Sequence, residues 1–325
     1  MKEYVIAASD EGSRLDKQLF KIMDKATAGF IYKMLRKKNI TLNGRRASGS
    51  ERLKCDDVIR IYLSDDTFDL MRTEKKEFIS SAHGDISGHI IYEDEDILLI
   101  NKPSGMLSQR SSAKDTSLNE LCLKYLMDND KAGSSNLDVF VPSICNRLDR
   151  NTSGIVIFAK TYVCARCIAS MLKEHRLKKT YRCHVKGIIN EPLSLNGYLT
   201  KDHKSNIVKV TDIKTDGSSK IITRYRPVKV YKDHTLLEVD LVTGKSHQIR
   251  AHLSSVHHPV LGDNKYGDFD LNRRLKEKYR IDSQMLHAYS LTLPDDMPPE
   301  LKRLSGMNFQ APMPDIFEKL DRDTV

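Results

Sequence analysis

The first fifth of the chain alternates apolar and basic positions with the spacing of helices. Apolar residues recur at Leu15, Leu19, Ile22 and Met23, then again within 30–35, and lysines and arginines fall between them. Residues three or four apart share one face of a helix, so the pattern predicts two short amphipathic helices with basic exposed faces. The following ITLNGRRASGSERLKCDDVIRIYL predicts two strands joined by a tight turn at Asn43-Gly44.

The pattern changes twice more along the chain. Residues 64–86 are polar and lose their periodicity, which indicates a linker. From Ile90 onward, short β-branched apolar runs such as ILLI, IVIFA and TLLEV predict strands, with helical stretches at 117–127 and 161–175. Because strand and helix do not alternate regularly, we expect an α+β fold with a mixed, largely antiparallel central sheet rather than a doubly wound one. The expected domains are 1–65, a linker over 66–86, and 87–325.

Composition narrows the class of protein. No apolar run is long enough to span a bilayer, and MKEYVIAASDEGSR has no signal-peptide core, so we expect a cytoplasmic protein. The six scattered cysteines favour reduced thiols over a disulfide framework, and the close pair Cys164 and Cys167 has the spacing of a packed helix face. The formal charge of +9 favours an acidic partner.

The basic charge is concentrated at the N-terminus. Residues 1–63 hold 14 Lys and Arg against 8 Asp and Glu. On the residues alone, this surface either contacts phosphates or is a solvated charged face. Arg14-Leu15-Asp16, the helix pair, ITLNGRR and LKCDDVI resemble the small RNA-binding domain named after the fourth ribosomal protein of the small subunit. The sequence departs from that family at KKN before Ile40 and at Cys55-Asp56, both in turns.

Four polar clusters punctuate the predicted sheet: NKPSGMLS, RLDRNTSG, VTGKSHQIRAHL and GDNKYG. Each combines Gly or Pro with charged groups, as sites at strand ends do. GKS lacks the upstream glycine of a phosphate-binding loop. The histidines have no Glu or Cys at metal-ligand spacing, and Ser153 lacks the frame of a nucleophile elbow. We therefore expect no metal and no cofactor.

Asp149, in the turn RLDRNTSG, is the remaining candidate for chemistry. Its neighbours Arg147 and Arg150 would favour the ionised carboxylate, which suits a nucleophile. The alternative is structural, because an Asp in such a turn also braces it with Thr152 and Ser153.

Six ordered motifs resemble the RluA-type pseudouridine synthases, over about 90–294. They are YEDEDILLINKPSG, NRLDRNTSGIVIFAK, KKTYRCHVKG, VTGKSHQIRAHL, VLGDNKYG and QMLHAYSL. Together with the N-terminal module they resemble the ribosomal RNA members of that family. The resemblance implies the pseudouridine synthase fold and isomerisation of uridine to pseudouridine.

The resemblance also implies roles for individual residues. Asp149 corresponds to the catalytic aspartate, Tyr181 to the tyrosine that stacks on the base, and Arg250 to the arginine paired with the aspartate. Arg147 corresponds to the arginine that displaces the base. Asn146 stands where many members have His, and Lys245-Ser246 replace Arg-Thr, so contacts of Lys245 with RNA can differ.

The expected partner is RNA, most simply large-subunit ribosomal RNA, and the expected state is a monomer. The alternatives are a transfer RNA substrate, or a non-catalytic RNA-binding or ribosome-assembly factor. The residues expected to contact RNA are Arg147, Lys102, Lys245, His247, Arg14, Lys33, Arg36, Lys37, Arg45 and Arg46. The C-terminal tail is expected only to pack.

Overall fold

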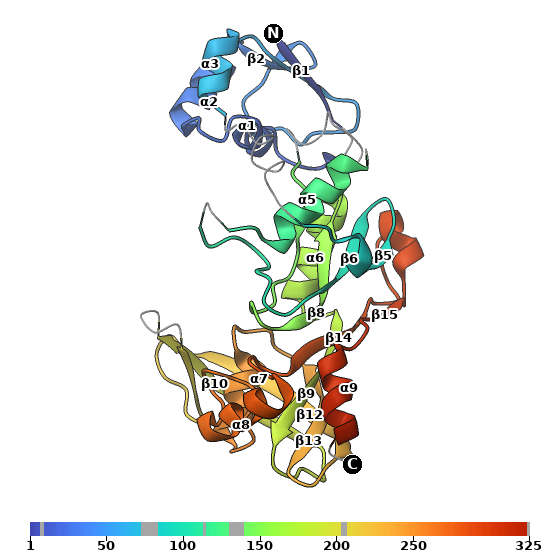
Figure 1. The fold of residues 1–325 in the computed structure, drawn as a ribbon. Helices are drawn as coiled ribbons and strands as arrows, with labels where there is room; N and C mark the ends of the chain where they lie inside the picture. Colours follow the sequence, from blue (N-terminus) through green and yellow to red (C-terminus); the bar gives the residue numbers. More distant parts are fainter. Residues whose placement is uncertain (7–9, 73–83, 113–114, 130–139, 203–206, 324–325) are drawn as a thin grey trace. The chain divides into compact units, whose positions relative to one another are not determined.

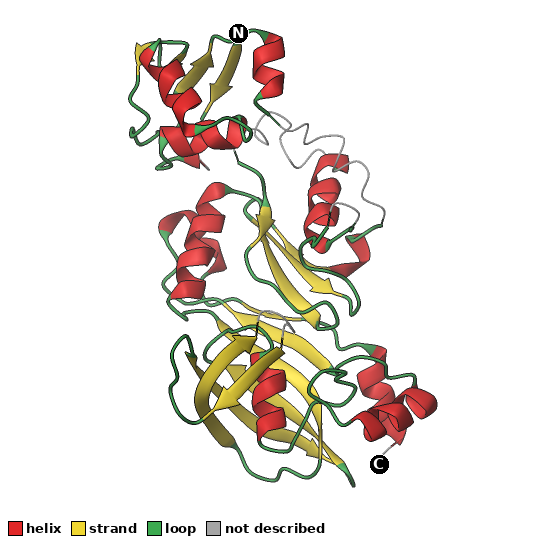
Figure 2. Ribbon diagram, turned by 90° about the vertical axis from the view of Figure 1, so that its left-hand side faces the viewer, coloured by secondary structure: helices red, strands yellow, loops and turns green. Residues whose placement is uncertain are grey.

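The computed structural model of the 325-residue chain describes residues 1–6, 10–72, 84–112, 115–129, 140–202 and 207–323. The chain divides into two compact units. The first comprises Met1–Leu98, Gln109–Asn146 and Ile157–Ala169, and the second comprises Leu99–Ser108, Arg147–Val156 and Ser170–Val325. Figure 1 follows the chain from end to end, and Figure 2 distinguishes its helices from its strands.

The N-terminal part of the first unit is a small antiparallel sheet packed against helices. The sheet order is β1-β4-β2-β3, with β1 (Lys2–Val5), β2 (Ile40–Leu42), β3 (Arg45–Arg46) and β4 (Val58–Ile61). The helices are α1 (Leu15–Ile22), α2 (Ala28–Arg36) and α3 (Asp65–Leu70).

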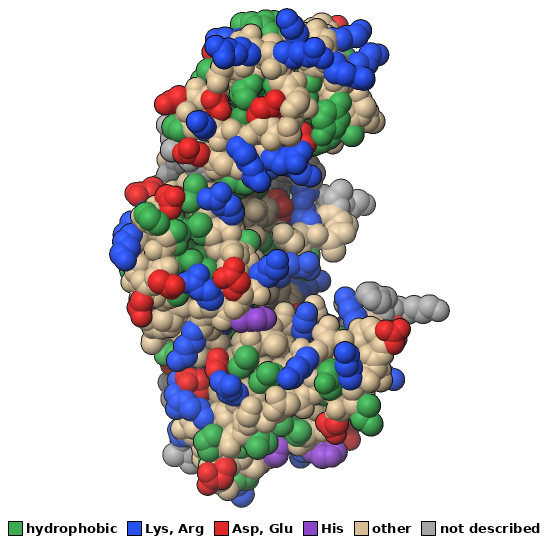
Figure 3. Space-filling view, turned by 180° about the vertical axis from the view of Figure 1, so that it is seen from behind, with side chains coloured by type: hydrophobic (Ala, Val, Ile, Leu, Met, Phe, Trp, Pro, Cys, Tyr) green, Lys and Arg blue, Asp and Glu red, His purple; other side chains and the backbone are tan. Residues whose placement is uncertain are grey.

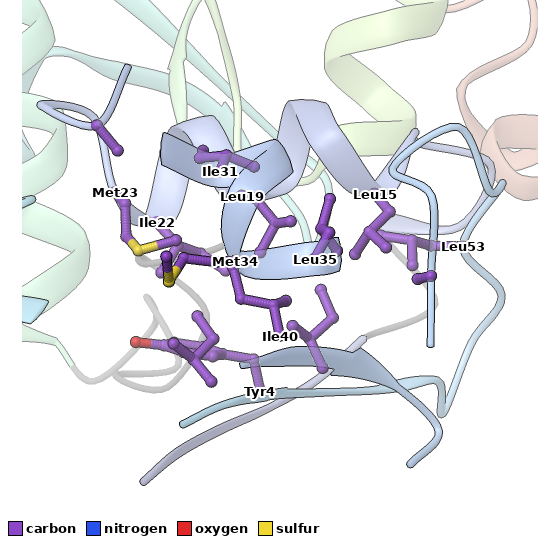
Figure 4. Close-up of a cluster of buried hydrophobic side chains, with 14 of the residues drawn as sticks. Tyr4, Leu15, Leu19, Ile22, Met23, Ile31, Met34, Leu35, Ile40 and Leu53 are labelled. Carbon is purple, nitrogen blue, oxygen red and sulfur yellow. The ribbon is translucent and has the colours of Figure 1, made fainter. Parts of the chain in front are cut away.

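The predicted helix pair is confirmed, and its apolar faces form the core of this part. Leu15, Leu19, Ile31 and Leu35 are buried, and Figure 4 shows them with Ile40 of the sheet in one cluster. The side chain of Thr27 accepts a hydrogen bond from the N–H of Phe30 and so caps the start of α2.

The tight turn between β2 and β3 is also confirmed. Asn43 and Gly44 have φ values of 51° and 73°. Both residues therefore adopt the left-handed conformation that a two-residue hairpin turn requires.

The expected linker at 66–86 is wrong in its first part. Residues 66–70 belong to α3, which Ser64 caps through its side chain. Phe68 is fully buried in the same core as α1 and α2. Because the segment is mostly polar, its composition gave no indication that Phe68 is part of the core. Residues 73–83 of the expected linker lie outside the described part of the chain.

The rest of the first unit contains the two helices predicted at 117–127 and 161–175. They are α5 (Leu118–Asp128), which begins with a capping box between Ser117 and Glu120, and α6 (Tyr162–Lys173). The short elements are η2 (Ser87–His89), β5 (Ile90–Glu93) and β7 (Ser143–Ile144). Two strands, β6 (Ile97–Lys102) and β8 (Ser153–Ala159), run through both units. All seven residues of β8 are buried, as its apolar run predicted.

The strands that follow β8 lie in the second unit and are three to twelve residues long. They are β9 (Lys178–Lys186), β10 (Leu193–Asp202), β11 (Ile207–Thr211), β12 (Ser219–Val230), β13 (His234–Leu241), β14 (Leu286–Thr292) and β15 (Asn308–Gln310). The strand order is β11-β10-β12-β13-β9-β14-β8-β6-β5, with β15 beside β14 and β7 beside β8. The pair of β14 with β8 is parallel, while β9 to β13 pair in antiparallel fashion. This confirms the predicted α+β fold with a mixed, largely antiparallel sheet.

The helices of the second unit pack on these strands. They are α7 (Gln248–Ser255), α8 (Phe269–Tyr279), η3 (Pro299–Leu304) and α9 (Asp315–Asp323). Ala251 of α7 packs against Leu199, Val208 and Ile221 of β10, β11 and β12. In the C-terminal tail, Phe317 is buried in a cluster with residues of α8. Within the described ranges, no helix combines the length and apolar character that a membrane span needs.

Candidate active site

Asp149 lies in the turn that leads into β8, within the second unit. Its backbone C=O accepts a hydrogen bond from the N–H of Thr152 at 3.0 Å. Its side chain is 26% exposed, while Thr152 and Ser153 are buried. The turn therefore presents one carboxylate at a partly exposed position on a buried strand start.

Strand β14 fixes the start of β8. Gly154 pairs with Ala288 so closely that a Cβ on the glycine would lie 2.2 Å from the Ala288 carbonyl oxygen. The Ser153 hydroxyl lies 2.8 Å from Nδ1 of His287, and both side chains are buried. These contacts leave the Asp149 turn little freedom to shift along the sheet.

Lys102 is bonded to the backbone of the same turn and does not face solvent. Its side chain is fully buried, and Nζ donates to the carbonyl oxygens of Pro103, Met106 and Arg150 at 2.9, 2.8 and 2.9 Å. Burial lowers its pKa to about 7, and the charge of Asp149 opposes this shift. Three acceptors match the three N–H groups of an ammonium. Lys102 was expected to contact RNA, but this position supports a structural role instead.

Arg250, in the first turn of α7, binds Asp149. Its Nη1 donates to Asp149 Oδ2 at 2.7 Å, while Nε and Nη2 donate to the two oxygens of Asp263 at 2.6 and 2.8 Å. Burial acts to lower the pKa of Arg250, and the two carboxylates raise it above its usual value. Burial also disfavours the charged form of Asp263 and would raise its pKa, but Arg250 holds that pKa below its usual range. The guanidinium is therefore ionised and fixed in orientation.

His247 immediately precedes α7 and faces the other oxygen of Asp149. Its backbone is left-handed, with φ 56° and ψ 13°. Nε2 lies 3.8 Å from Asp149 Oδ1, and Nδ1 lies 2.8 Å from the hydroxyl of Tyr266. Burial lowers the pKa of His247, with Asp149 acting in the opposite direction. The imidazole is therefore neutral at neutral pH.

Tyr181 on β9 is buried near the same carboxylate. Its residue is 8% exposed, and burial raises the pKa of the phenol, with the charge of Asp149 adding to the rise. In the described part of the chain, its hydroxyl has no hydrogen-bond partner. Tyr181 is therefore close enough to Asp149 for its phenol to feel the charge of the carboxylate.

The arginines adjacent to Asp149 in sequence do not hold its carboxylate. Arg150 turns away, and its Nε donates to the carbonyl of Gly105 at 3.0 Å. Arg147 is exposed. The sequence pointed to these two neighbours as the partners of the carboxylate, but the contact is made by Arg250, which lies 101 positions away in sequence.

The other residues expected to contact RNA lie on the surface. Lys245 is exposed in the loop before α7. In the N-terminal module, Arg14 is bound to Asp16 at 2.6 Å. The remaining cations of the module are exposed: Lys33, Arg36, Lys37, Arg45 and Arg46. Figure 3 shows Lys and Arg side chains on this module at the top of the view.

Sequence reasoning assigned no role to Asp263 or Tyr266, although it singled out the segment GDNKYG that contains them. Both side chains support groups that face Asp149. The one available signal was that a buried arginine needs an anionic partner. In the described residues, no group of three or more His, Cys, Asp and Glu side chains is arranged to hold a metal ion.

The arrangement suits chemistry at a single carboxylate. Asp149 has one oxygen bonded by a fixed guanidinium, and among the described residues its second oxygen has no hydrogen bond at standard length. A carboxylate oriented in this way can act as a nucleophile or accept a proton.

The chain has relatives among known proteins. Residues 96–255 match the family model described as RNA pseudouridylate synthase. A relative from Rickettsia bellii named ribosomal large subunit pseudouridine synthase C is 31% identical over 320 residues, which cover 95% of this chain and 97% of the relative. A protein of Mycoplasma genitalium named as an uncharacterized RNA pseudouridine synthase is 30% identical, with 98% of both chains covered.

A solved structure shares the fold. Human RNA pseudouridylate synthase domain containing 4 aligns with a TM-score of 0.53 at 19% identity, covering 73% of this chain and 93% of that chain. At this identity the likeness concerns the fold alone.

Proposed function

The chain belongs to the RNA pseudouridylate synthase family, and from this premise we propose that it isomerises uridines of large-subunit ribosomal RNA with Asp149 as the catalytic carboxylate. The substrate class rests on the relatives named ribosomal large subunit pseudouridine synthase C, from Rickettsia bellii and from Buchnera aphidicola. The matches span 95% and 98% of this chain, and 97% and 96% of the two relatives, so they include both the N-terminal module and the larger part.

The observation that carries the catalytic assignment is the contact of Asp149 with Arg250. The reaction breaks the bond between ribose and the uracil nitrogen, turns the base and rejoins it through carbon 5. Cleavage leaves carbon 1′ of the ribose electron-poor, and a carboxylate can bond to that carbon or accept the proton of carbon 2′. When carbon 5 bonds to carbon 1′, carbon 5 loses its proton and the freed ring nitrogen gains one. Arg250 orients this carboxylate through a hydrogen bond to one oxygen, and Asp263 keeps Arg250 in place.

The uridine must leave its stack before the base can turn. Tyr181 is the proposed stacking platform, because its ring lies near Asp149 and its phenol stays protonated. Arg147 is exposed beside the catalytic turn and is the proposed residue that takes the place of the displaced base. Lys245, also exposed, is a proposed phosphate contact.

The N-terminal module is the proposed second RNA-binding surface. Its fold of two helices against a small sheet leaves exposed cations on α2 and on the β2–β3 hairpin. We assign it to residues 1–65, in the manner of the ribosomal-protein domain that its sequence resembles, with α3 extending its core. The monomeric state and the cytoplasmic location expected from the sequence stay predictions.

The test is to map pseudouridines by carbodiimide modification in total RNA from cells with and without the gene. Complementation uses wild type and Asp149→Asn, which removes the charge and keeps the shape. We expect defined large-subunit sites to be lost on deletion and restored by wild type only.

Three outcomes would contradict parts of this proposal. Restoration by Asp149→Asn would refute the catalytic assignment. Loss confined to transfer RNA would replace the substrate. An unchanged RNA, with an assembly defect that Asp149→Asn corrects, would favour a non-catalytic assembly factor.

A further inference from the structure

The segment Asp263–Tyr266 supports both groups that face the catalytic carboxylate. Asp263 binds Arg250, which bonds Oδ2 of Asp149. Tyr266 binds His247, which faces Oδ1. The ring of Tyr266 also lies under the guanidinium of Arg250, with the ring centroid 5.2 Å from Cζ. The proposed function gives a role to the contact of Asp263 with Arg250, but not to the contact of Tyr266 with His247.

The contacts of Tyr266 and Asp149 together favour a proton on Nε2 of His247. The Tyr266 hydroxyl accepts the N–H of Val208 at 2.9 Å, so its own proton is available for Nδ1 of His247 at 2.8 Å. A neutral imidazole that accepts at Nδ1 carries its proton on Nε2. That N–H faces Oδ1 of Asp149, where the opposite tautomer would set two lone pairs against each other.

The backbone of His247 also points to a positional requirement. Its left-handed conformation is uncommon for a residue other than glycine, and such conformations persist where the surrounding structure demands them. The 3.8 Å separation from Asp149 exceeds a hydrogen bond. Catalytic contacts of this length commonly shorten when substrate binds.

We propose that His247 is a positioning residue for Asp149: its Nε2–H, presented by the hydroxyl of Tyr266, orients the oxygen that Arg250 leaves unbonded. This inference rests on the proposed function of Asp149. A carboxylate held at one oxygen can still rotate about its Cβ–Cγ bond, and a second donor fixes its plane. The role differs from the direct RNA contact expected for His247 from the sequence.

The test is a double-mutant cycle with His247→Ala and Tyr266→Phe. Single-turnover rates are measured at saturating, in vitro transcribed large-subunit ribosomal RNA, by release of tritium from carbon 5 of labelled uridine. The dissociation constant for the same RNA is measured in parallel. Each single variant is expected to slow the chemical step about tenfold or more, the effect of losing one hydrogen bond to a charged group, with RNA affinity unchanged.

The pairing of Tyr266 with His247 predicts strong non-additivity. Tyr266→Phe should have no further effect in a His247→Ala background, because the hydroxyl acts through the imidazole. His247→Gln, which retains an N–H donor, should recover part of the rate. Tyr289→Phe is the matched control, because its hydroxyl also donates a hydrogen bond and its ring also lies under an arginine, Arg182. It should leave the rate unchanged.

Two results would overturn the inference. The first is a His247→Ala variant that loses RNA affinity but keeps its rate at saturation, which would make His247 an RNA contact. The second is multiplicative effects of the two substitutions. Asp149→Asn assayed alongside separates this inference from the proposed function: if it keeps full activity, the catalytic assignment fails, whatever the cycle gives.

Discussion

Arg250 is held by Asp263 through two hydrogen bonds, at 2.6 and 2.8 Å, and reaches Asp149 with its third nitrogen. Asp263 is fully buried and Asp149 is not. The fork geometry of the guanidinium allows it to bind two carboxylates. One edge pairs in plane with Asp263, and the remaining nitrogen is available for Asp149. Asp263 thus fixes the position of Arg250, and Arg250 in turn orients Asp149.

Asp263→Asn should therefore impair both stability and catalysis. The substitution keeps the shape but removes the charge that compensates a buried guanidinium, which costs about 3 to 5 kcal/mol when a buried pair is broken. We expect urea denaturation to show a loss of this size, and single-turnover kinetics to show a slower chemical step.

Asp270→Asn is the matched control for this prediction. Asp270 also pairs with an arginine, Arg273, but both side chains are more than two thirds exposed. Its substitution should change neither stability nor rate measurably. Equal effects of the two substitutions would show that burial of the Arg250 pair is unimportant.

Lys102→Met tests whether Lys102 is structural. The substitution keeps an apolar stem but leaves three carbonyl groups, of Pro103, Met106 and Arg150, without their donor. We expect a loss of about 2 kcal/mol in the free energy of unfolding, since unsatisfied buried acceptors cost about 1 to 3 kcal/mol and removal of a buried charge offsets part of this. The chemical step should slow while RNA affinity is kept.

The control for Lys102 is the exposed Lys302 in η3. Lys302→Met should leave stability and catalysis unchanged. A Lys102→Met variant with normal stability and weakened RNA binding would instead support the RNA contact expected from the sequence.

Gly154→Ala should disrupt the start of β8. Gly154 has φ +110°, and an added Cβ would lie 2.2 Å from the carbonyl oxygen of Ala288. We expect a loss of about 4 kcal/mol or failure to fold, because both backbone strain and a clash with backbone are involved. Gly29→Ala is the control, since a Cβ on Gly29 in α2 meets nothing within 4 Å. It should stabilise the helix by up to about 1 kcal/mol. Urea denaturation of both variants decides the matter.

The local elements followed from the sequence because their signals are local. The helix periodicity of Leu15 to Leu35, the Asn43-Gly44 turn and the uniformly apolar run of β8 each depend on neighbours within a few positions. The same locality explains the error at α3, where Phe68 is buried in a core that includes the distant residues of α1 and α2 and the polar composition around it gave no signal.

The candidate site was less accessible to local reasoning. Asp149 itself stood out as a charged residue at a strand start, and the family resemblance supplied Arg250. Nothing in the sequence showed that the third member is Asp263, or that Lys102 points inward instead of outward. Those facts depend on how α7, the 103–106 loop and the Asp149 turn meet in space, which periodicity does not encode.

Acidification should destabilise the protein well above the range in which carboxylates titrate. Burial lowers the pKa of His252 and His287 to about 4 and that of His184 to about 3. Their usual value in an unfolded chain is about 6.5. Between these values the unfolded state binds more protons than the folded state, so stability is lost as the pH falls from about 6.5 towards 4.

The expected slope is up to about 4 kcal/mol per pH unit, at about 1.4 kcal/mol per unit for each histidine. Urea denaturation at pH 7, 6 and 5 measures it. His287→Gln should flatten the slope by about a third, while His257→Gln, at an exposed position, should leave it unchanged. A slope near zero over this range would mean that these histidines are protonated in the folded protein.

Substitutions in the N-terminal module can test RNA binding separately from the chemical step. Arg45 and Arg46 are exposed on β3 in the first unit, whereas Asp149, Arg250 and Tyr181 all belong to the second. Replacing both arginines with glutamine should weaken binding of large-subunit ribosomal RNA. It should also reduce the slope of log affinity against log salt by roughly 1.5 to 2, the effect of losing two phosphate contacts.

The rate at saturating RNA should stay unchanged, because none of the groups that hold Asp149 is altered. The control removes two equally exposed charges from the second unit, with Lys302→Gln and Lys319→Gln. Since counterion release depends on which charges touch phosphate and not on net charge alone, the control should keep the original salt slope. Equal losses in both variants would mean that only overall charge matters and that the module contributes no dedicated surface.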